Sequence, residues 1–241
     1  MRCFLRRFAE YGTTLHGMTA YFDGREMAMV HRMFRREFLL AGGLVMNTTT
    51  NDRASLVADH ITSVGTTLHH HHHMEDTHVW PLLEERCPDD IADIVALMES
   101  QHANVAKYGE EVTEAMAAWR TDFGQDTRDA LVAALDRLVP ALLEHLDTEE
   151  ERVVPLMEKH ITMDEWNKQI AEGIAEIDPQ ELMVGFGMAM YEGDEDIIAA
   201  TIANMPPDVR PVIRDVASNA YAAKAEALYG TATPPRSWEL V

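Results

Sequence analysis

The chain has 241 residues, enough for one large domain or for a domain with an appendage. Its 20 Lys and Arg are outnumbered by 41 Asp and Glu, a formal net charge of −21, which argues against nucleic-acid or membrane-surface partners. No apolar run approaches the ~20 residues that span a bilayer. With Cys3 and Cys87 as its two cysteines, the chain has no disulfide framework and is typical of the reducing cytoplasm. The composition is compatible with a protein partner and with formation of a homo-oligomer.

The first half of the chain predicts two helices after a short flexible N-terminal segment. Residues 1–23 begin with a basic stretch that lacks the apolar region of a secretory signal, and we expect a flexible segment without a catalytic role. A first helix is expected over about 24–45, with His31 on its apolar stripe. The polar residues 47–52 then form a turn that caps a second helix, which fades after Pro81.

Two more long helices follow. Asp89 suits the N-terminus of the third helix, where the helix dipole favours negative charge, and His102 lies on that helix's stripe. A polar turn leads into the fourth helix. Four long helices joined by short polar turns predict an all-α, up-down-up-down four-helix bundle over residues 24–162.

The pattern changes beyond this bundle. Thr162 with Glu165, and Asp178 ahead of a proline, are typical of capped helix starts. About four shorter helices are expected over residues 163–230, and residues 231–241 are expected to be a tail. Because no His is paired with a carboxylate on one face here, we interpret this region as a helical extension packed on the bundle.

The most informative feature is a repeat, in which residues 57–82 recur 74 positions later. The aligned apolar residues step by three or four positions, so each copy forms one stripe along a helix. Each stripe is interrupted by a histidine and, four residues on, by a glutamate: His71 with Glu75, and His145 with Glu149. A buried imidazole and a buried carboxylate are each costly without a partner. The two copies therefore predict two halves of one metal site.

The first and third helices each add a histidine to these two pairs. One such histidine alone is more often a core residue with a hydrogen-bond partner, but four on four stripes disfavour that interpretation. In an antiparallel bundle the six side chains can converge at one level, and four imidazoles with two carboxylates suit a pair of iron ions. The predicted metal ligands are His31, His71, Glu75, His102, His145 and Glu149.

The run His69 to His73 needs a choice between neighbours. It is internal and continuous with the helical stripe. His71 continues that stripe and aligns with His145. His72 stays an alternative ligand, since it too lies four residues from Leu68.

The order and spacing of these ligands resemble the hemerythrin-type cation-binding domain over about Gly24 to Ile161. The resemblance implies a four-helix bundle around an oxo- or hydroxo-bridged, non-haem di-iron centre with two iron ions. It also implies one iron held by His31 and His71, the other by His102 and His145, and bridging by Glu75 and Glu149.

One departure from the family pattern lies on the third helix. Oxygen-carrying hemerythrins place a second histidine four residues after the first there, and this chain has Ala106. The resemblance then implies one protein nitrogen fewer and an exchangeable coordination position. Glu99 is an alternative ligand on this helix, and Glu150 is a rival to Glu149. The missing imidazole favours reaction with peroxide or nitric oxide over stable dioxygen carriage.

The predicted function is to bind or react with small oxidants or diatomics: peroxide, nitric oxide or dioxygen. Whether the protein is an enzyme stays open; as an enzyme it would be a peroxide- or nitric-oxide-consuming oxidoreductase. An alternative is an iron- or oxygen-responsive sensing or interaction module without turnover. A ferritin-like di-iron oxidase would use Glu75-x-x-His78 and Glu99-x-x-His102, but these motifs lie 24 residues apart and leave three histidines unexplained.

Overall fold

The computed structural model describes residues 20–174 and 177–240, so residues 1–19 of the expected flexible N-terminal segment lie outside the described residues. The described part is helical, and its one β contact is an isolated bridge between Tyr21 and Thr162. The all-helical prediction is therefore confirmed. Within these same ranges, no helix is both long and apolar enough to cross a membrane.

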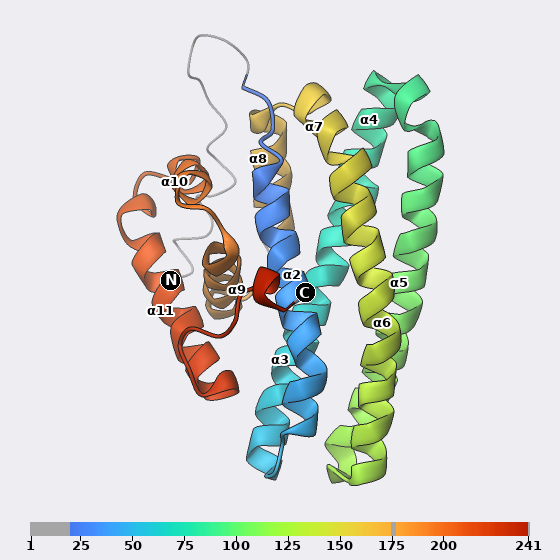
Figure 1. Ribbon diagram of the computed structural model, residues 1–241. Helices are drawn as coiled ribbons and strands as arrows, with labels where there is room; N and C mark the ends of the chain where they lie inside the picture. The colour runs from blue at the N-terminus through green and yellow to red at the C-terminus, as the bar shows by residue number, and fades with distance from the viewer. Residues whose placement is uncertain (1–19, 175–176, 241) are drawn as a thin grey trace.

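Four long helices lie side by side in Figure 1: α2 (Arg25–Met46), α3 (Asn51–Met74), α5 (Pro88–Asp122) and α6 (Gln125–Arg152). Helix α2 packs against α3 and α6, and α5 packs against the same two helices, so the four enclose a common interior. The turn before α3 works as expected, because the Thr50 hydroxyl accepts a hydrogen bond from the Arg53 backbone N–H.

The two copies of the repeat, 74 positions apart, each appear as a long helix followed by a short one. Helix α3 passes through a π-helical turn, η2 (Glu75–Val79), into α4 (Trp80–Arg86), and α6 is followed by α7 (Val154–His160). Pro81 and Pro155 lie in the first turns of α4 and α7, where a missing backbone N–H costs nothing. The two short helices pack against each other and close one end of the interior.

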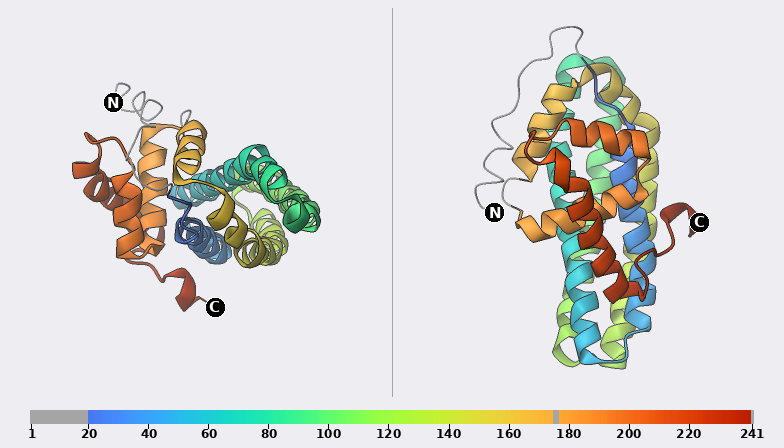
Figure 2. Two further views of the ribbon diagram at one scale, coloured as in Figure 1. Left: turned by 90° about the horizontal axis from the view of Figure 1, so that it is seen from above. Right: turned by 90° about the vertical axis from the view of Figure 1, so that its left-hand side faces the viewer.

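The C-terminal extension forms four shorter helices: α8 (Met163–Gly173), α9 (Pro179–Glu192), α10 (Glu195–Ala203) and α11 (Arg210–Tyr229). Both expected caps are present, since Thr162 forms a capping box with Glu165 and Asp178 accepts backbone hydrogen bonds at the start of α9. Helix α9 packs on α2 and α11, and Figure 2 shows the extension on one side of the long helices.

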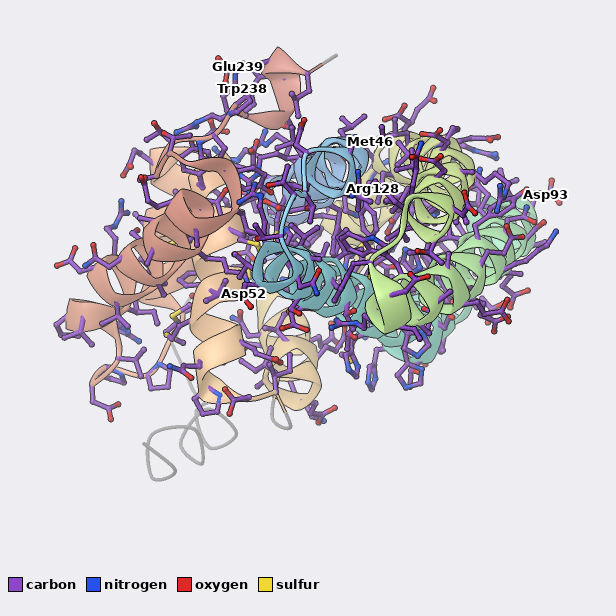
Figure 3. The ribbon with its side chains drawn as sticks, turned by 90° about the horizontal axis from the view of Figure 1, so that it is seen from below. Met46, Asp52, Asp93, Arg128, Trp238 and Glu239 are labelled. Carbon is purple, nitrogen blue, oxygen red and sulfur yellow. The ribbon has the colours of Figure 1, made fainter. Side chains whose placement is uncertain are left out.

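Two segments expected to be loose are attached to the helices where they are described. At the start, the Phe22 backbone N–H donates to the Ile161 carbonyl at 3.0 Å. At the end, η3 (Ser237–Glu239) contacts α2, and the buried Ser237 hydroxyl donates to Glu192 at 2.9 Å. Figure 3 shows Trp238 at the outer edge of this C-terminal turn. The predicted tail, as far as residue 240, is thus anchored through side chains that composition did not reveal.

The interior contains two apolar clusters with a polar layer between them. On α2, Met27 belongs to one cluster and Phe34 to the other. On α5 the same holds for Met98 and Val105. The histidines lie between these pairs along the sequence, so packing on both sides fixes the level of the candidate site.

Candidate metal centre

The polar layer contains two groups of ligand atoms that share one carboxylate. In each group the atoms lie within 4.8 Å of one another. The first cluster consists of His31, His71, Glu75 and Glu149, and the second cluster consists of His72, Glu75, His102 and His145. All six residues predicted from the sequence are therefore brought together, and His72 joins them.

In the first cluster the side chains from α2, α3, η2 and α6 face one another closely. The Nε2 atoms of His31 and His71 are 3.2 Å apart, and His71 Nε2 lies 3.0 Å from a Glu75 oxygen. Two atoms each about 2.1 Å from one metal ion are about 3.0 to 3.4 Å apart at octahedral to tetrahedral angles. The spacing of this cluster therefore fits ligands of a single ion.

In the second cluster three imidazoles surround a common point. The ring centroids of His72 and His102 are 4.2 Å apart in a stacked arrangement. His145 stands across both rings, with centroid distances of 4.7 Å to His72 and 4.6 Å to His102. The carboxylate of this cluster is Glu75, which has one oxygen 3.5 Å from His102 Nε2.

The two glutamates lie between the clusters. One Glu75 oxygen faces His71 and the other faces His102. Glu149 places one oxygen 3.4 Å from His31 Nε2 and 3.6 Å from His145 Nε2. Each carboxylate is thus within reach of imidazoles from both clusters, the arrangement that a bridging ligand requires.

Hydrogen bonds on the far side of the rings fix the orientation of two histidines. His31 Nδ1 is 2.9 Å from Glu150, which also accepts from Arg35. His102 Nδ1 is 2.8 Å from Asp76. A carboxylate that accepts from Nδ1–H leaves the Nε2 lone pair pointing into the cluster, which is the tautomer that a metal ligand needs.

Asp76 is held in turn by Trp80, whose indole N–H donates to the same carboxylate at 2.9 Å. Both residues belong to the turn that begins at Glu75, since Asp76 is in η2 and Trp80 opens α4. Single π-helical turns inside α-helices occur often at functional sites. This turn places one shared carboxylate and one supporting carboxylate in consecutive positions.

Most of the inward-facing atoms, except the Nε2 atoms of His31 and His71, have no protein hydrogen-bond partner. Among the buried side-chain atoms without one are both oxygens of Glu75 and Glu149, the Nε2 atoms of His72 and His102, and both ring nitrogens of His145. Most buried polar groups in proteins are paired, so this concentration calls for a ligand. A donor set of imidazoles and carboxylates fits iron or a similar divalent metal.

Burial disfavours charge throughout this layer. Desolvation lowers the pKa of His145 to about 2, with the neighbouring His102 adding to the effect. Desolvation is the main cause that raises the pKa of Glu149 to about 8, and the charge of Glu75 contributes to this rise. Without a metal the imidazoles are neutral and the carboxyl groups are easily protonated. Two divalent cations would supply the positive charge that the ionised carboxylates lack.

Several alternatives lie outside both clusters. Ala106 and Glu99 are exposed, and Glu150 supports His31 from behind. Ala106 supplies no nitrogen, whereas His72 of α3 places a further imidazole nitrogen in the second cluster. His78 belongs to neither cluster, so the ferritin-like pairing of motifs is not assembled in the described residues.

Helical periodicity does not identify Asp76 as the partner of His102, and it favours His71 over His72 because one stripe accommodates His71 more readily. In the structure the two adjacent histidines diverge, so that His71 enters the first cluster and His72 the second. The histidine run itself indicates this divergence. Two neighbouring helix positions can supply ligands to two metals only when both positions face the interior of the helices.

The comparisons with known proteins agree with this geometry. The model of the family described as "Hemerythrin HHE cation binding domain" matches residues 25–157, which is more than half of the chain. All residues of the two clusters lie within the matched range. No curated protein and no solved structure matches the chain.

Proposed function

Because the chain belongs to the hemerythrin HHE cation-binding domain family, we propose that its two clusters hold a non-haem di-iron centre that binds or reacts with small oxidants or diatomics. The observation that carries this proposal is the concentration of unpartnered, buried imidazole and carboxylate atoms in two adjacent groups. We also propose that the long helices form the up-down-up-down bundle of the family.

The assignment of ligands follows the clusters. We propose that His31 and His71 hold one iron, that His102 and His145 hold the other, and that Glu75 and Glu149 bridge them. We propose that His72 supplies a third imidazole ligand to the second iron. Bound iron would supply redox chemistry and coordination positions that a small molecule can occupy.

The protein's own residues supply orientation and exclusion. Glu150 and Asp76 hold the Nδ1 protons of His31 and His102, and so keep the Nε2 atoms available to metal. Phe34 is fully buried, with its ring centroid 5.3 Å from that of His71, and it limits the space beside the first cluster. A site enclosed in this way admits diatomics or peroxide and excludes larger substrates.

The two clusters are unequal in nitrogen ligands, and this inequality supports reactivity over carriage. The first cluster has two imidazoles and the second has three. An iron with two imidazoles and two carboxylate oxygens keeps exchangeable positions in a six-coordinate shell. We therefore place the reactive position on the first cluster rather than opposite Ala106.

Metal content is the first test. The full chain, loaded anaerobically with Fe²⁺ and desalted, should contain about two irons per chain, with near-ultraviolet bands after oxidation. His145→Ala should lower the iron content, whereas His70→Ala, at an exposed position of the same histidine run, should leave it unchanged. A stoichiometry of one, or retention of zinc alone after iron loading, would contradict a di-iron centre.

Reactivity is the second test. Stopped-flow spectroscopy of the reduced, iron-loaded protein with peroxide, nitric oxide and dioxygen should show fast reaction with peroxide or nitric oxide. A long-lived dioxygen adduct that releases dioxygen intact, without peroxide consumption, would instead establish a carrier.

A sensing role is the second candidate, favoured by one observation. Helix α2 carries His31 and also packs against α9 of the extension. Metal occupancy could be transmitted through α2 to the extension without turnover. Iron-dependent changes in hydrogen exchange within α9, combined with no peroxide or nitric-oxide consumption, would favour sensing.

The setting of this function is also proposed. Two cysteines and a strongly acidic chain favour work in the cytoplasm, without nucleic-acid or membrane partners. A protein partner or self-association stays open, and size measurement of the iron-loaded protein addresses it.

A further inference from the structure

A second candidate site lies apart from the metal layer. A partly open cavity of about 200 Å³ lies between α2 and the extension helices α8, α9, α10 and α11. No residue of either metal cluster lines it. Its wall is mainly apolar and includes Met29, Trp166, Met183, Phe186, Met205 and Ile213.

The side chains around this cavity are less buried than their chemistry favours. Leu182, Met183 and Phe186 come from consecutive turns of α9 and are only half-buried. At the rim, Ile170 is 42% exposed. Protein interiors leave few voids larger than a water molecule, so an apolar hollow of this size is more than a packing defect. An apolar occupant would remove these side chains from water.

One buried acidic group marks the wall. Glu26 is 8% exposed, and its carboxyl oxygens accept hydrogen bonds from Trp166 Nε1 at 2.8 Å and from Thr201 Oγ1 at 2.9 Å. All three residues line the cavity. A carboxylate has about four lone-pair sites, so two partners hold Glu26 in place and leave acceptor capacity for a third.

Size and polarity together define the ligand. An apolar cavity of about 150 Å³ is enough to bind benzene, so one of about 200 Å³ accommodates a slightly larger ring system. The apolar wall disfavours a charged ligand, and Glu26 favours an N–H donor. We propose that this cavity is a binding site for a compact, uncharged aromatic molecule of about two fused rings with one N–H group directed at Glu26. This site is independent of the proposed iron chemistry.

Indole is the probe that tests this proposal. Isothermal titration of the full chain with indole should show one site, and benzofuran, with the same shape but an oxygen in place of N–H, should bind about tenfold more weakly, because it leaves the Glu26 acceptor unused. Equal affinity for both probes would overturn the role of Glu26. Absence of binding by either probe at millimolar concentration would overturn the site.

Two substitutions locate the binding. Ala171→Phe places a ring into the cavity from α8 and should abolish indole binding. Ala220→Phe, at a half-buried position of α11 outside the cavity lining, is the matched control and should bind indole as the native chain does. Thermal melts check that both variants fold. If Ala171→Phe does not fold, Met183→Trp is used to fill the same cavity. Equal binding by the native chain and a folded cavity-filling variant would overturn the location.

A shortened chain separates a ligand site from self-occupancy. The same titration is made with residues 20–241. Indole binding to both chains supports the proposal. Binding to the shortened chain but not to the full chain would overturn it, because residues 1–19 would then compete for the cavity.

Discussion

At the scale of single residues, the site depends on which of several neighbouring histidines face the interior. His72 is 7% exposed and its Nε2 has no protein partner, whereas His73 is exposed. His71 lies in the first cluster and His72 in the second. Three consecutive residues therefore have three different environments, although they share one side-chain type.

We expect His72→Ala to lower the iron content toward one per chain and His73→Ala to leave it near two. The reason is that His72 contributes a nitrogen to the second cluster only, and loss of a buried ligand leaves its partners unpaired. Metal analysis of both purified variants, with thermal melts, provides the measurement. Equal iron content in the two variants would remove His72 from the ligand set.

The pKa values in the metal layer predict a pH dependence of the metal-free protein. The pKa of Glu149 in the folded state is raised to about 8, above the ordinary 4.5, so the folded state keeps a proton that the unfolded state releases. The free energy of unfolding is highest while both states are protonated, and this contribution is lost progressively as pH rises through 8. The pKa of His145 is lowered to about 2, so below pH 6.5 the unfolded state binds a proton that the folded state does not. The free energy of unfolding therefore falls as the pH drops below 6.5. Between pH 6.5 and 8 the carboxyl effect remains, and the metal-free protein should become less stable with rising pH.

Thermal melts between pH 6.5 and 8 measure this effect. The melting temperature of the metal-free chain should fall across this range, and iron-loaded protein should show a smaller fall, because bound cations favour the ionised carboxylates. Glu149→Gln cannot ionise at this position and should make the metal-free profile less steep, while Glu75, whose pKa burial also raises, keeps part of the fall. A rising profile in the metal-free native chain would contradict the raised pKa.

At the scale of elements, a buried ionic cluster joins α2 to the extension. Arg36 is fully buried and donates to Glu37 at 2.7 Å and to Glu192 of α9 at 2.8 Å. Burial alone would raise the pKa of Glu37, but the charge of Arg36 and hydrogen bonds from His60 and Tyr229 lower it to about 2. These contacts tie α3, α9 and α11 to α2 through one guanidinium and two carboxylates.

Removing one member of this cluster should be costly. Glu192→Gln leaves the buried Arg36 charge without its α9 partner, and we expect a loss of about 3 kcal/mol or more in the free energy of unfolding. Glu195→Gln removes the carboxylate of an exposed ion pair with Arg214 and should cost no more than about 1 kcal/mol. Denaturant unfolding of both variants compares them. A similar loss in the free energy of unfolding for both variants would show that the buried ion pair of Glu192 contributes no more to stability than the exposed pair of Glu195.

At the scale of the whole molecule, the extension and the long helices share one hydrophobic core. One apolar cluster contains Met188, Ile197 and Ala217 of the extension. The same cluster contains Phe34 and many other apolar residues of the four long helices. The extension therefore covers apolar surface of α2 as well as its buried charges. The proposed metal ligands, in contrast, all come from the four long helices and η2.

Truncation after Ile161 separates these two contributions. The shortened chain keeps every proposed ligand and should still take up about two irons, but it exposes the partners of the extension. We expect its melting temperature to fall by about 10 °C, since loss of about 3 kcal/mol or more shifts the midpoint by about that amount in a chain of this size. Iron titration and thermal melts of the truncated chain check both. A helical but iron-free truncation would mean that the extension helps to form the site.

The sequence alone determined the helices, their order and the level of the site. Period-3.6 stripes locate the four long helices, and the repeat of His71 and Glu75 as His145 and Glu149 points to a shared interior layer. Cap residues such as Thr162 and Asp178 marked helix starts because capping is a local interaction. These features survive folding because each depends on a few neighbouring residues.

Tertiary structure alone decided the rest. Whether His72 faces inward depends on how α3 is rotated against α5 and α6, and its stacking on His102 brings together residues far apart in the chain. The same holds for Arg36, whose partner Glu192 is 156 residues away, and for the cavity beside Glu26. Helical periodicity specifies a face to within about one residue, but side-chain partners across helices are selected by packing and desolvation, which act only in the assembled molecule.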